Sequence, residues 1–284
     1  MPDNEIPMPT PTINPPPPLP SYKIISFDVY GTLIRYKSHI LTSFTPLLSR
    51  LPPDSQYLVS TPLSTTIPNS ATTGQITFLK LFQQKEDEIK LETSTRRFDQ
   101  ILSEIWTRIA AELKVSTTTT EATDFGSKAN IASWPTFTGT VAALQTLQSR
   151  GYKLVALSNI DKFAWDITAP ASGLDQVPWH KVFTAEDFGT DLHKADEAKL
   201  ETLIRFASEQ GVAKEQILHV AQSLGHDHAP AKKLGLSSVF LIGDGPVWGK
   251  EGESKMAVEK GLVGYGWRCE DLKAFVDVVT SQGG

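Results

Sequence analysis

The stretch Lys23-Ile24-Ile25-Ser26-Phe27-Asp28-Val29-Tyr30-Gly31-Thr32-Leu33 decides the fold. Its first half is an apolar run typical of a buried strand, and the run stops abruptly at an aspartate that is followed by a glycine turn. This order predicts a carboxylate at the carboxyl end of a buried strand. Asp28 is therefore a candidate nucleophile, and Tyr30 follows two residues later, at a position that a second carboxylate could occupy.

From about Trp134 onward, helical and strand-like segments alternate. The strand-like apolar runs cover residues 153–157, 182–185, 217–221 and 239–242. Segments with helical spacing of apolar residues separate them. Strands that alternate with helices imply right-handed crossovers and a parallel sheet with both faces covered. The predicted fold class is α/β, with a Rossmann-like parallel-sheet core and helices on both faces.

A helical unit is predicted between the first strand and this alternating region. Apolar residues recur at helical spacing in residues 76–89 and again in residues 98–109. The segments 51–74 and 115–130 are rich in Ser, Thr and Pro and are predicted to be surface loops. The helices therefore form an insertion into the α/β core.

Three units follow from this organisation. Residues 1–20 are dominated by proline, which favours extended polyproline II and predicts a disordered tail. Residues 21–36 and 134–284 form the predicted α/β core domain. Residues 37–133 form the predicted helical domain inserted into it.

Composition and charge narrow the class of protein. The chain has 284 residues, of which 40% are hydrophobic, and this is enough for a large core in one or two domains. A net charge of -5 with scattered basic residues gives no support for a nucleic-acid partner, and no apolar stretch is long enough to span a membrane. Cys269 is the only cysteine, so a reducing, cytoplasmic setting is predicted. The expected partner is a small-molecule substrate. The sequence leaves open whether two chains form a homodimer.

Polar residues follow the predicted strands at the point where each strand ends. They are Asp28, Ser158-Asn159, Glu186-Asp187 and Gln222-Ser223, with Asp227 close behind. Ligands of open parallel sheets bind outside the carboxyl ends of the strands. Such residues also cap helices, so one alone would prove nothing. Several at successive strand ends, with Lys194 between two of the strands, indicate a shared site.

These residues resemble the haloacid dehalogenase superfamily, whose members form a covalent intermediate on the aspartate of an Asp-x-x-Gly-Thr motif. The run from Asp28 to Thr32 matches that motif, and three further matches follow in family order. They are Leu157-Ser158-Asn159, Lys194-Ala195-Asp196 and the run from Gln222 to Asp227. The resemblance covers roughly residues 22–243 and implies that the helical insertion is a cap domain closing over the strand ends.

Two positions argue against metal-dependent phosphoryl transfer. The phosphatases of this superfamily use a carboxylic acid two positions after the nucleophile and a magnesium-binding carboxylate in the fourth motif, and these positions carry Tyr30 and Gln222 here. Tyrosine, with a pKa of about 10, is a poor acid near neutrality, and magnesium is held mainly by anionic oxygens. Tyr30 is what the hydrolytic 2-haloacid dehalogenases carry. The resemblance thus implies a reaction without metal or other cofactor.

The same resemblance implies the catalytic roles. Asp28 would displace halide from the α-carbon of a 2-halocarboxylate, and water would then hydrolyse the resulting ester, giving an inverted 2-hydroxy acid. Lys194 would keep Asp28 ionised in a partly desolvated site. Asp227 is the candidate that orients or activates the water.

The predicted substrate contacts come from the core and from the cap. Their residues are Tyr30, Thr32, Ser158, Asn159, Ser223 and Lys80. Ser158 and Asn159 are expected to hold the substrate carboxylate, since hydroxyl, amide and helix-start donors suit anions. Lys80 is the positional match for the family's halide-binding arginine, although it lacks the guanidinium fork and reads equally well as an exposed helix lysine.

Two alternatives stay open. A phosphatase using Asp227 and Glu186 is one, and a binding protein on a retired hydrolase fold is the other. The second is prompted by the departures at Lys80 and at Leu200, where the family often has an aromatic hydroxyl. Of the two histidines beside Asp227, one is expected to face solvent and one to line the pocket, without a metal.

Overall fold

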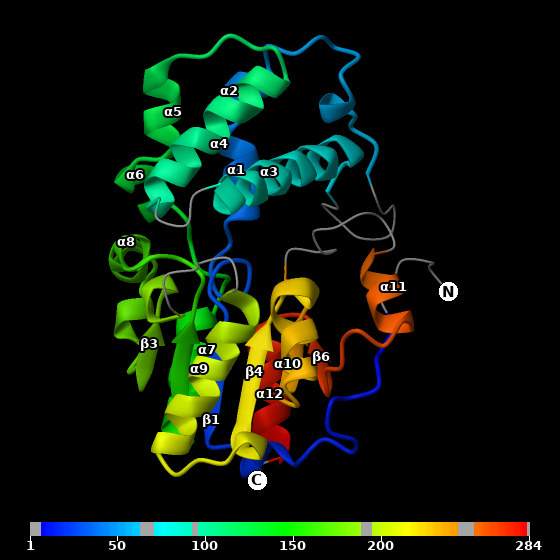
Figure 1. The fold of residues 1–284 in the computed structure, drawn as a ribbon, viewed down its shortest axis with the longest axis vertical. Coiled ribbons are helices and arrows are strands. Elements are labelled where there is room, and N and C mark those ends of the chain that lie inside the picture. Colours follow the sequence, from blue (N-terminus) through cyan, green and yellow to red (C-terminus); the bar gives the residue numbers. More distant parts are fainter. Residues whose placement is uncertain (1–6, 63–70, 93–95, 189–194, 244–252, 283–284) are drawn as a thin grey trace.

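The computed structural model describes residues 7–62, 71–92, 96–188, 195–243 and 253–282. These residues form an α/β unit with a second, purely helical layer above it (Figure 1). Among the predicted site residues, Lys194 lies outside the described residues. No helix in the described ranges is long and apolar enough to cross a membrane.

A six-stranded sheet, parallel throughout, forms the centre of the α/β unit. Its strands are β1 (Ile24–Phe27), β2 (Lys153–Leu157), β3 (Lys181–Phe183), β4 (Ile217–Ala221), β5 (Ser237–Leu241) and β6 (Trp267–Cys269). Their order is β3-β2-β1-β4-β5-β6, so β1 lies between β2 and β4 at the point where the strand order reverses. The predicted fold class is confirmed.

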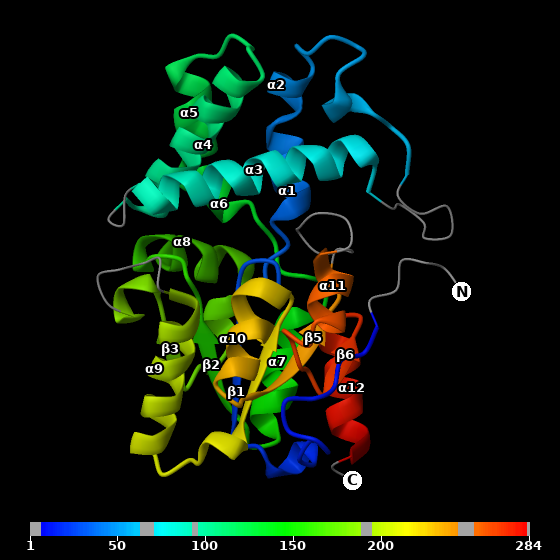
Figure 2. The ribbon, with the colours of Figure 1, turned by 45° about the vertical axis from the view of Figure 1, so that its right-hand side comes forward.

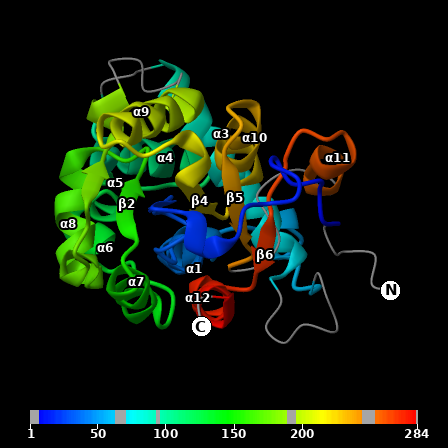
Figure 3. The same ribbon diagram turned by 90° about the horizontal axis from the view of Figure 1, so that it is seen from below.

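Helices cover both faces of the sheet. On one face, Ile24 and Ile217 pack against Leu200 and Leu203 of α9 (Ala195–Glu209). On the other, apolar strand residues such as Phe27 pack with α7 (Thr140–Ser149) and α12 (Leu272–Gln282). Figure 3 shows α9 and α10 (Ala229–Lys233) on one side of the strands and α7 and α12 on the other. The central strands are buried on both faces, which is why their sequences are mostly apolar.

The helical layer is inserted between β1 and β2 and lies above the carboxyl ends of the strands (Figure 2). Its helices are α1 (Lys37–Ser43), α2 (Thr45–Leu48), α3 (Thr73–Glu92), α4 (Phe98–Glu112), α5 (Thr119–Phe125) and α6 (Lys128–Ala132). Its own aromatic core is built around Phe44, whose ring centroid lies 4.5 to 6.1 Å from those of Phe78, Phe82, Trp106 and Phe125. The predicted domain limits stay predictions.

The prediction of a loop over residues 115–130 is wrong, because α5 and α6 occupy most of it. Thr118 and Ser127, which read as loop residues, are the N-caps of these helices. The Thr118 hydroxyl accepts from the backbone N–H of Glu121 at 3.1 Å, and the Glu121 side chain accepts from the backbone N–H of Thr118 at 2.9 Å. Polar residues of this kind favour helix starts as well as loops.

The proline-rich segment also differs from the predicted tail where it is described. The backbone N–H of Thr12 donates to the carbonyl of Gly264 at 3.1 Å, and Leu19 is buried. A Cβ at Gly264 would lie 2.9 Å from the Thr10 carbonyl oxygen, so the glycine allows this close approach. The stretch from Pro7 to Pro16 therefore lies against the segment that enters the edge strand β6, and an extended proline-rich chain suits such an edge. Residues 1–6 lie outside the described residues.

Candidate active site

Asp28 lies directly after β1, at the middle of the sheet's carboxyl edge. Its backbone N–H donates to the carbonyl of Val220 at 3.1 Å, which ties it to the neighbouring strand β4. The Thr32 hydroxyl donates to Asp28 Oδ2 at 2.7 Å and accepts from the backbone N–H of Gln222 at 3.0 Å. Because the second bond occupies a lone pair of Thr32, the hydroxyl proton points at the carboxylate. The predicted contact between Thr32 and Asp28 is present.

A buried lysine that acts on this carboxylate is Lys199 of α9. Its Nζ lies 2.7 Å from Asp227 Oδ1, and both side chains are buried. Lys199 also acts electrostatically on Asp28. Sequence reasoning missed Lys199, although a signal was present. Lys199 precedes Leu203 by four residues and Ala207 by eight, so a lysine stands on the apolar face of a helix.

The charges of these three groups depend on one another. Burial and the charge of Asp227 raise the pKa of Asp28 to about 7, against the opposing effects of Lys199 and of the Thr32 hydrogen bond. Burial disfavours ionised Asp227, yet Lys199 and His219 hold the pKa of its carboxyl well below the usual range. Burial also disfavours the charge of Lys199, but Asp227 and Asp28 together raise its pKa. The Lys199–Asp227 pair is thus ionised, and Asp28 titrates near neutrality.

A buried histidine fixes the position of Asp227. His219 Nε2 lies 3.0 Å from Asp227 Oδ1, and its Nδ1 lies 2.9 Å from the hydroxyl of Ser26, its partner across β1 and β4. Ionised Asp227 accepts from the Nε2–H of His219. His219 and Ser26 are fully buried. These hydrogen bonds therefore orient Asp227, and the serine is shielded from substrate.

Tyr30, two residues after Asp28, belongs to a cluster of aromatic rings. Its hydroxyl lies 2.6 Å from the hydroxyl of Thr168, on α8 (Lys162–Ser172). Its ring centroid lies 5.5 Å from those of Phe98 and Trp134 and 6.0 Å from that of Tyr36. Burial raises the pKa of the Tyr30 hydroxyl well above its usual range. The position that would hold a general acid in a phosphatase is therefore packed and stays neutral.

Asn159 connects the second, third and fourth sequence motifs. Its Nδ2 donates to Asp196 Oδ1 at 3.2 Å, and Asp196 Oδ2 lies 2.8 Å from His226 Nδ1. Within the described part of the chain, Asn159 Oδ1 is buried without a hydrogen-bond partner. The Ser158 hydroxyl accepts from the backbone N–H of Ile160 at 3.3 Å. Both predicted residues lie at the end of β2, and their contact with a substrate carboxylate stays a prediction.

Other predicted site residues are engaged elsewhere. The Ser223 hydroxyl accepts from the backbone N–H of His226 at 3.1 Å, so Ser223 is the N-cap of the turn that carries Asp227. Glu186 is exposed and accepts from the backbone N–H of Lys162 at 3.0 Å. No hydrogen bond or ion pair among the described residues joins Lys80 to this site.

The two histidines beside Asp227 differ in position. His226 is exposed to solvent, with a side chain 57% exposed, as predicted for one of them. The prediction that the other lines the pocket is wrong. His228 is fully buried, with Nδ1 2.9 Å from the Ser238 hydroxyl and Nε2 3.0 Å from the Ala221 carbonyl. Burial lowers its pKa to about 4, so His228 is a neutral packing residue behind the site.

Comparison with known proteins decides the family. The sequence profile of the haloacid dehalogenase-like hydrolases matches residues 22–246, which is most of the chain. The chain belongs to this hydrolase family. The match includes Asp28, Lys199 and Asp227. A comparison with curated protein sequences found no match.

Solved structures with the same fold include several dehalogenases. An L-2-haloacid dehalogenase from Xanthobacter autotrophicus with chloropropionic acid covalently bound is 15% identical, with a TM-score of 0.60 over 91% of this chain and 98% of that one. A defluorinating L-2-haloacid dehalogenase is 14% identical, with a TM-score of 0.61 over 93% and 99%. A protein described as a predicted phosphoglycolate phosphatase from Haemophilus somnus is 17% identical, with a TM-score of 0.56 over 91% and 98%. At these identities, the likeness establishes the fold that the hydrolase shares with them.

One turn of α3 faces the strand ends of the hydrolase, and Lys80 is not on it. Burial raises the pKa of Tyr36, and the carboxylates of Glu86, Asp28 and Asp87 raise it further. Lys90 Nζ lies 2.7 Å from Glu86. The charge of Asp196 on the core also acts on Lys90 and raises its pKa. The turn from Glu86 to Lys90 is therefore one part of the inserted helices that acts on the site, and Lys37 of α1 is another, since its Nζ donates to Gln222 Oε1 at 3.2 Å.

Proposed function

We propose that this hydrolase converts small 2-halocarboxylic acids into 2-hydroxy acids through an ester on Asp28. The observation that carries the proposal is the aromatic packing of Tyr30. A phosphatase needs an acid at this position to protonate its leaving group, whereas a departing halide needs no proton. An apolar wall of Tyr30, Phe98 and Trp134 suits the alkyl part of a haloacid.

The reaction consists of two displacements. Because Thr32 engages Oδ2, the other oxygen of Asp28 is the one that attacks the α-carbon from the side opposite the halogen. The carbon–halogen bond breaks, and the halide leaves with the electron pair. Water then attacks Cγ of Asp28, the ester bond breaks, the 2-hydroxy acid departs and one proton goes to solvent. The configuration at the α-carbon inverts in the first step alone.

The charges around Asp28 support both steps. Lys199 favours the ionised nucleophile, which would otherwise be disfavoured by burial. Asp227 is held rigidly by Lys199 and His219, which suits a group that orients the water. Its low pKa makes it a weak proton acceptor, so we assign it orientation rather than proton abstraction. Two other lysines of the inserted helices act on the core: Lys90, which is under the charge of Asp196, and Lys37, whose Nζ donates to Gln222 Oε1 at 3.2 Å.

Halide release tests the proposal directly. We expect the protein to release chloride from 2-chloropropionate in the presence of EDTA, and mass spectrometry to detect the 1-carboxyethyl ester on the peptide containing Asp28. Absence of halide release from chloro-, bromo- and fluoro-acids alike would overturn the proposal. Magnesium-dependent hydrolysis of p-nitrophenyl phosphate would favour the phosphatase instead. That alternative relied on Glu186, which caps a backbone N–H on the surface, and on Asp227, which is locked in its ion pair.

The rate should depend on pH through Asp28. Only the ionised carboxylate attacks carbon, and its pKa is raised to about 7, so kcat/KM should rise as the pH rises through 7 and level off above it. Between pH 5.5 and 8.5 the ionised fraction grows about thirtyfold, and we expect a similar change in kcat/KM for 2-chloropropionate. Circular dichroism at both pH values provides the control for folding. A flat profile over this range would contradict the assignment of Asp28 as the titrating nucleophile.

A further inference from the structure

One carboxylate joins the inserted helices to the α/β core. Asp161 precedes α8, and its Oδ1 accepts from the backbone N–H of Ala164 at 2.7 Å, which caps that helix. Its Oδ2 accepts from the backbone N–H of Phe98 at 2.6 Å, and Phe98 is the first residue of α4. The first N–H groups of a helix have no partner within the helix. Asp161 therefore caps two helices that belong to different layers of the molecule.

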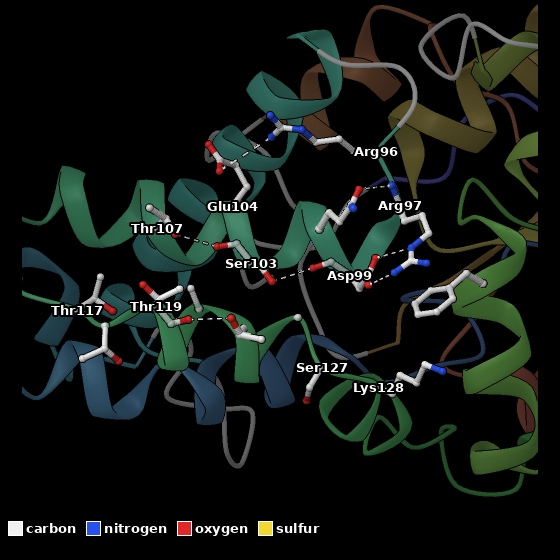
Figure 4. A pocket seen from close by; sticks show the side chains of 16 residues that line it. Arg96, Arg97, Asp99, Ser103, Glu104, Thr107, Thr117, Thr119, Ser127 and Lys128 are labelled. Carbon is white, nitrogen blue, oxygen red and sulfur yellow. Dashed lines mark hydrogen bonds and ion pairs between the residues drawn. The ribbon is translucent and has the colours of Figure 1, made fainter.

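Further contacts at the same junction are weaker. The guanidinium carbon of Arg97 lies 4.1 Å from the ring centroid of Phe163 on α8, and Lys128 Nζ lies 5.4 Å from it. Figure 4 shows Arg97 beside Asp99, with Lys128 on the opposite side of a hollow of about 760 Å³. The Arg97 side chain is 53% exposed, and contacts of exposed cations contribute little. The partly buried Asp161 bonds are thus the main polar link at this junction.

This link reaches the site through Phe98. The Phe98 ring is buried, and its centroid lies 5.5 Å from that of Tyr30 and 6.0 Å from that of Trp134. Tyr30 is held from its other end by Thr168, which is also on α8. Helix α8 therefore fixes Tyr30 through Thr168, and fixes the ring packed on Tyr30 through Asp161.

We propose that Asp161 is a positioning residue that holds α4 on α8 and thereby keeps Phe98 against Tyr30 beside Asp28. The contact itself is independent of the reaction, and only its kinetic consequence rests on the proposed function. Loss of the bond frees the start of α4, so that the apolar wall moves away from Asp28 and substrate binds less tightly.

The substitution Asp161→Asn separates the two bonds. Asparagine is as good an N-cap as aspartate, so its amide oxygen still serves Ala164, while its NH₂ group cannot accept from Phe98. We expect amide hydrogen exchange in a peptide covering residues 96–102 to speed up about tenfold or more, with a peptide from β4 unchanged. For 2-chloropropionate we expect KM to rise about tenfold, with a smaller change in kcat.

Thr118→Ala provides the matched control. It removes an N-cap of α5, whose bond to Glu121 lies wholly within the inserted helices. We expect it to destabilise the protein without changing exchange in residues 96–102 or KM. The proposal is overturned if Asp161→Asn leaves that exchange unchanged, or if both variants speed it equally. If exchange responds as expected but the unmodified protein releases no halide, the junction stands and the dehalogenase proposal alone fails.

Discussion

The substitution Asp28→Asn is expected to abolish halide release and, above pH 7, to stabilise the fold. The neutral amide is a far weaker nucleophile than a carboxylate, so turnover should fall roughly 10³-fold or more. The amide oxygen can still accept from Thr32, so the surrounding hydrogen bonds are kept. No peptide carrying a 1-carboxyethyl ester should form when the variant is incubated with 2-chloropropionate.

The gain in stability follows from the raised pKa of Asp28. An aspartate titrates near 3.9 in the unfolded chain and near 7 here, so the folded state holds its proton more tightly. Its contribution to stability is fully present below pH 3.9 and is lost as the pH rises through 7. Asparagine carries no such penalty. The free energy of unfolding gained by Asp28→Asn should therefore be larger at pH 8 than at pH 5.5, by about 2 kcal/mol.

Denaturant unfolding of both proteins at the two pH values measures this difference. Asp227 stays ionised throughout because its pKa is far lower, so its titration does not interfere. An equal change in stability at pH 5.5 and pH 8 would show that Asp28 is not a strained anion in the folded state. If the variant is inactive but more stable, Asp28 serves the reaction although it lowers the stability of the fold.

Much of the fold was predictable because the central strands are buried on both faces. The predicted bounds 153–157 and 217–221 coincide with β2 and β4, whose side chains are nearly all buried. The edge strand β6 was not identified. It has three residues, and Arg268 at its middle interrupts any apolar run. Strand β3, at the other edge, also has three residues, but its apolar pair Val182-Phe183 was enough to predict it.

The parts of the site whose residues lie close together in the sequence were predictable. Asp28 and Thr32 belong to one turn, so their contact is local and follows from the motif. The partner of Asp227 depends on how α9 packs on the sheet, which no local pattern fixes. The resemblance indicated Lys194, whereas Lys199 forms the ion pair in the described chain. A lysine at an apolar position of an amphipathic helix is the signal that would have identified it.

The second large effect is expected from Lys199→Met. Methionine fills the volume of the lysine chain but leaves Asp227 buried with His219 as its one remaining side-chain hydrogen-bond partner among the described residues. Breaking a buried ion pair by removing one partner typically costs about 3 to 5 kcal/mol, because the remaining charge is left uncompensated. We expect a loss of this size in the free energy of unfolding. Lys233→Met is the matched control, since Lys233 pairs with Glu197 at 2.6 Å on the surface, where such a pair contributes about 1 kcal/mol or less.

The kinetic consequence separates Lys199 from Lys194. Lys199 lowers the pKa of Asp28, so its removal should shift the midpoint of the pH profile of kcat/KM upward from about 7, by roughly one unit or more. Lys194→Met is measured in parallel. If Lys194→Met moves the midpoint and Lys199→Met does not, then the lysine implied by the resemblance serves the nucleophile and Lys199 only stabilises Asp227. If only Lys199→Met shifts the midpoint, the positive charge that compensates Asp28 comes from α9. A purely structural effect of the substitution would lower the amount of folded protein, but it would not change the pH at which Asp28 ionises.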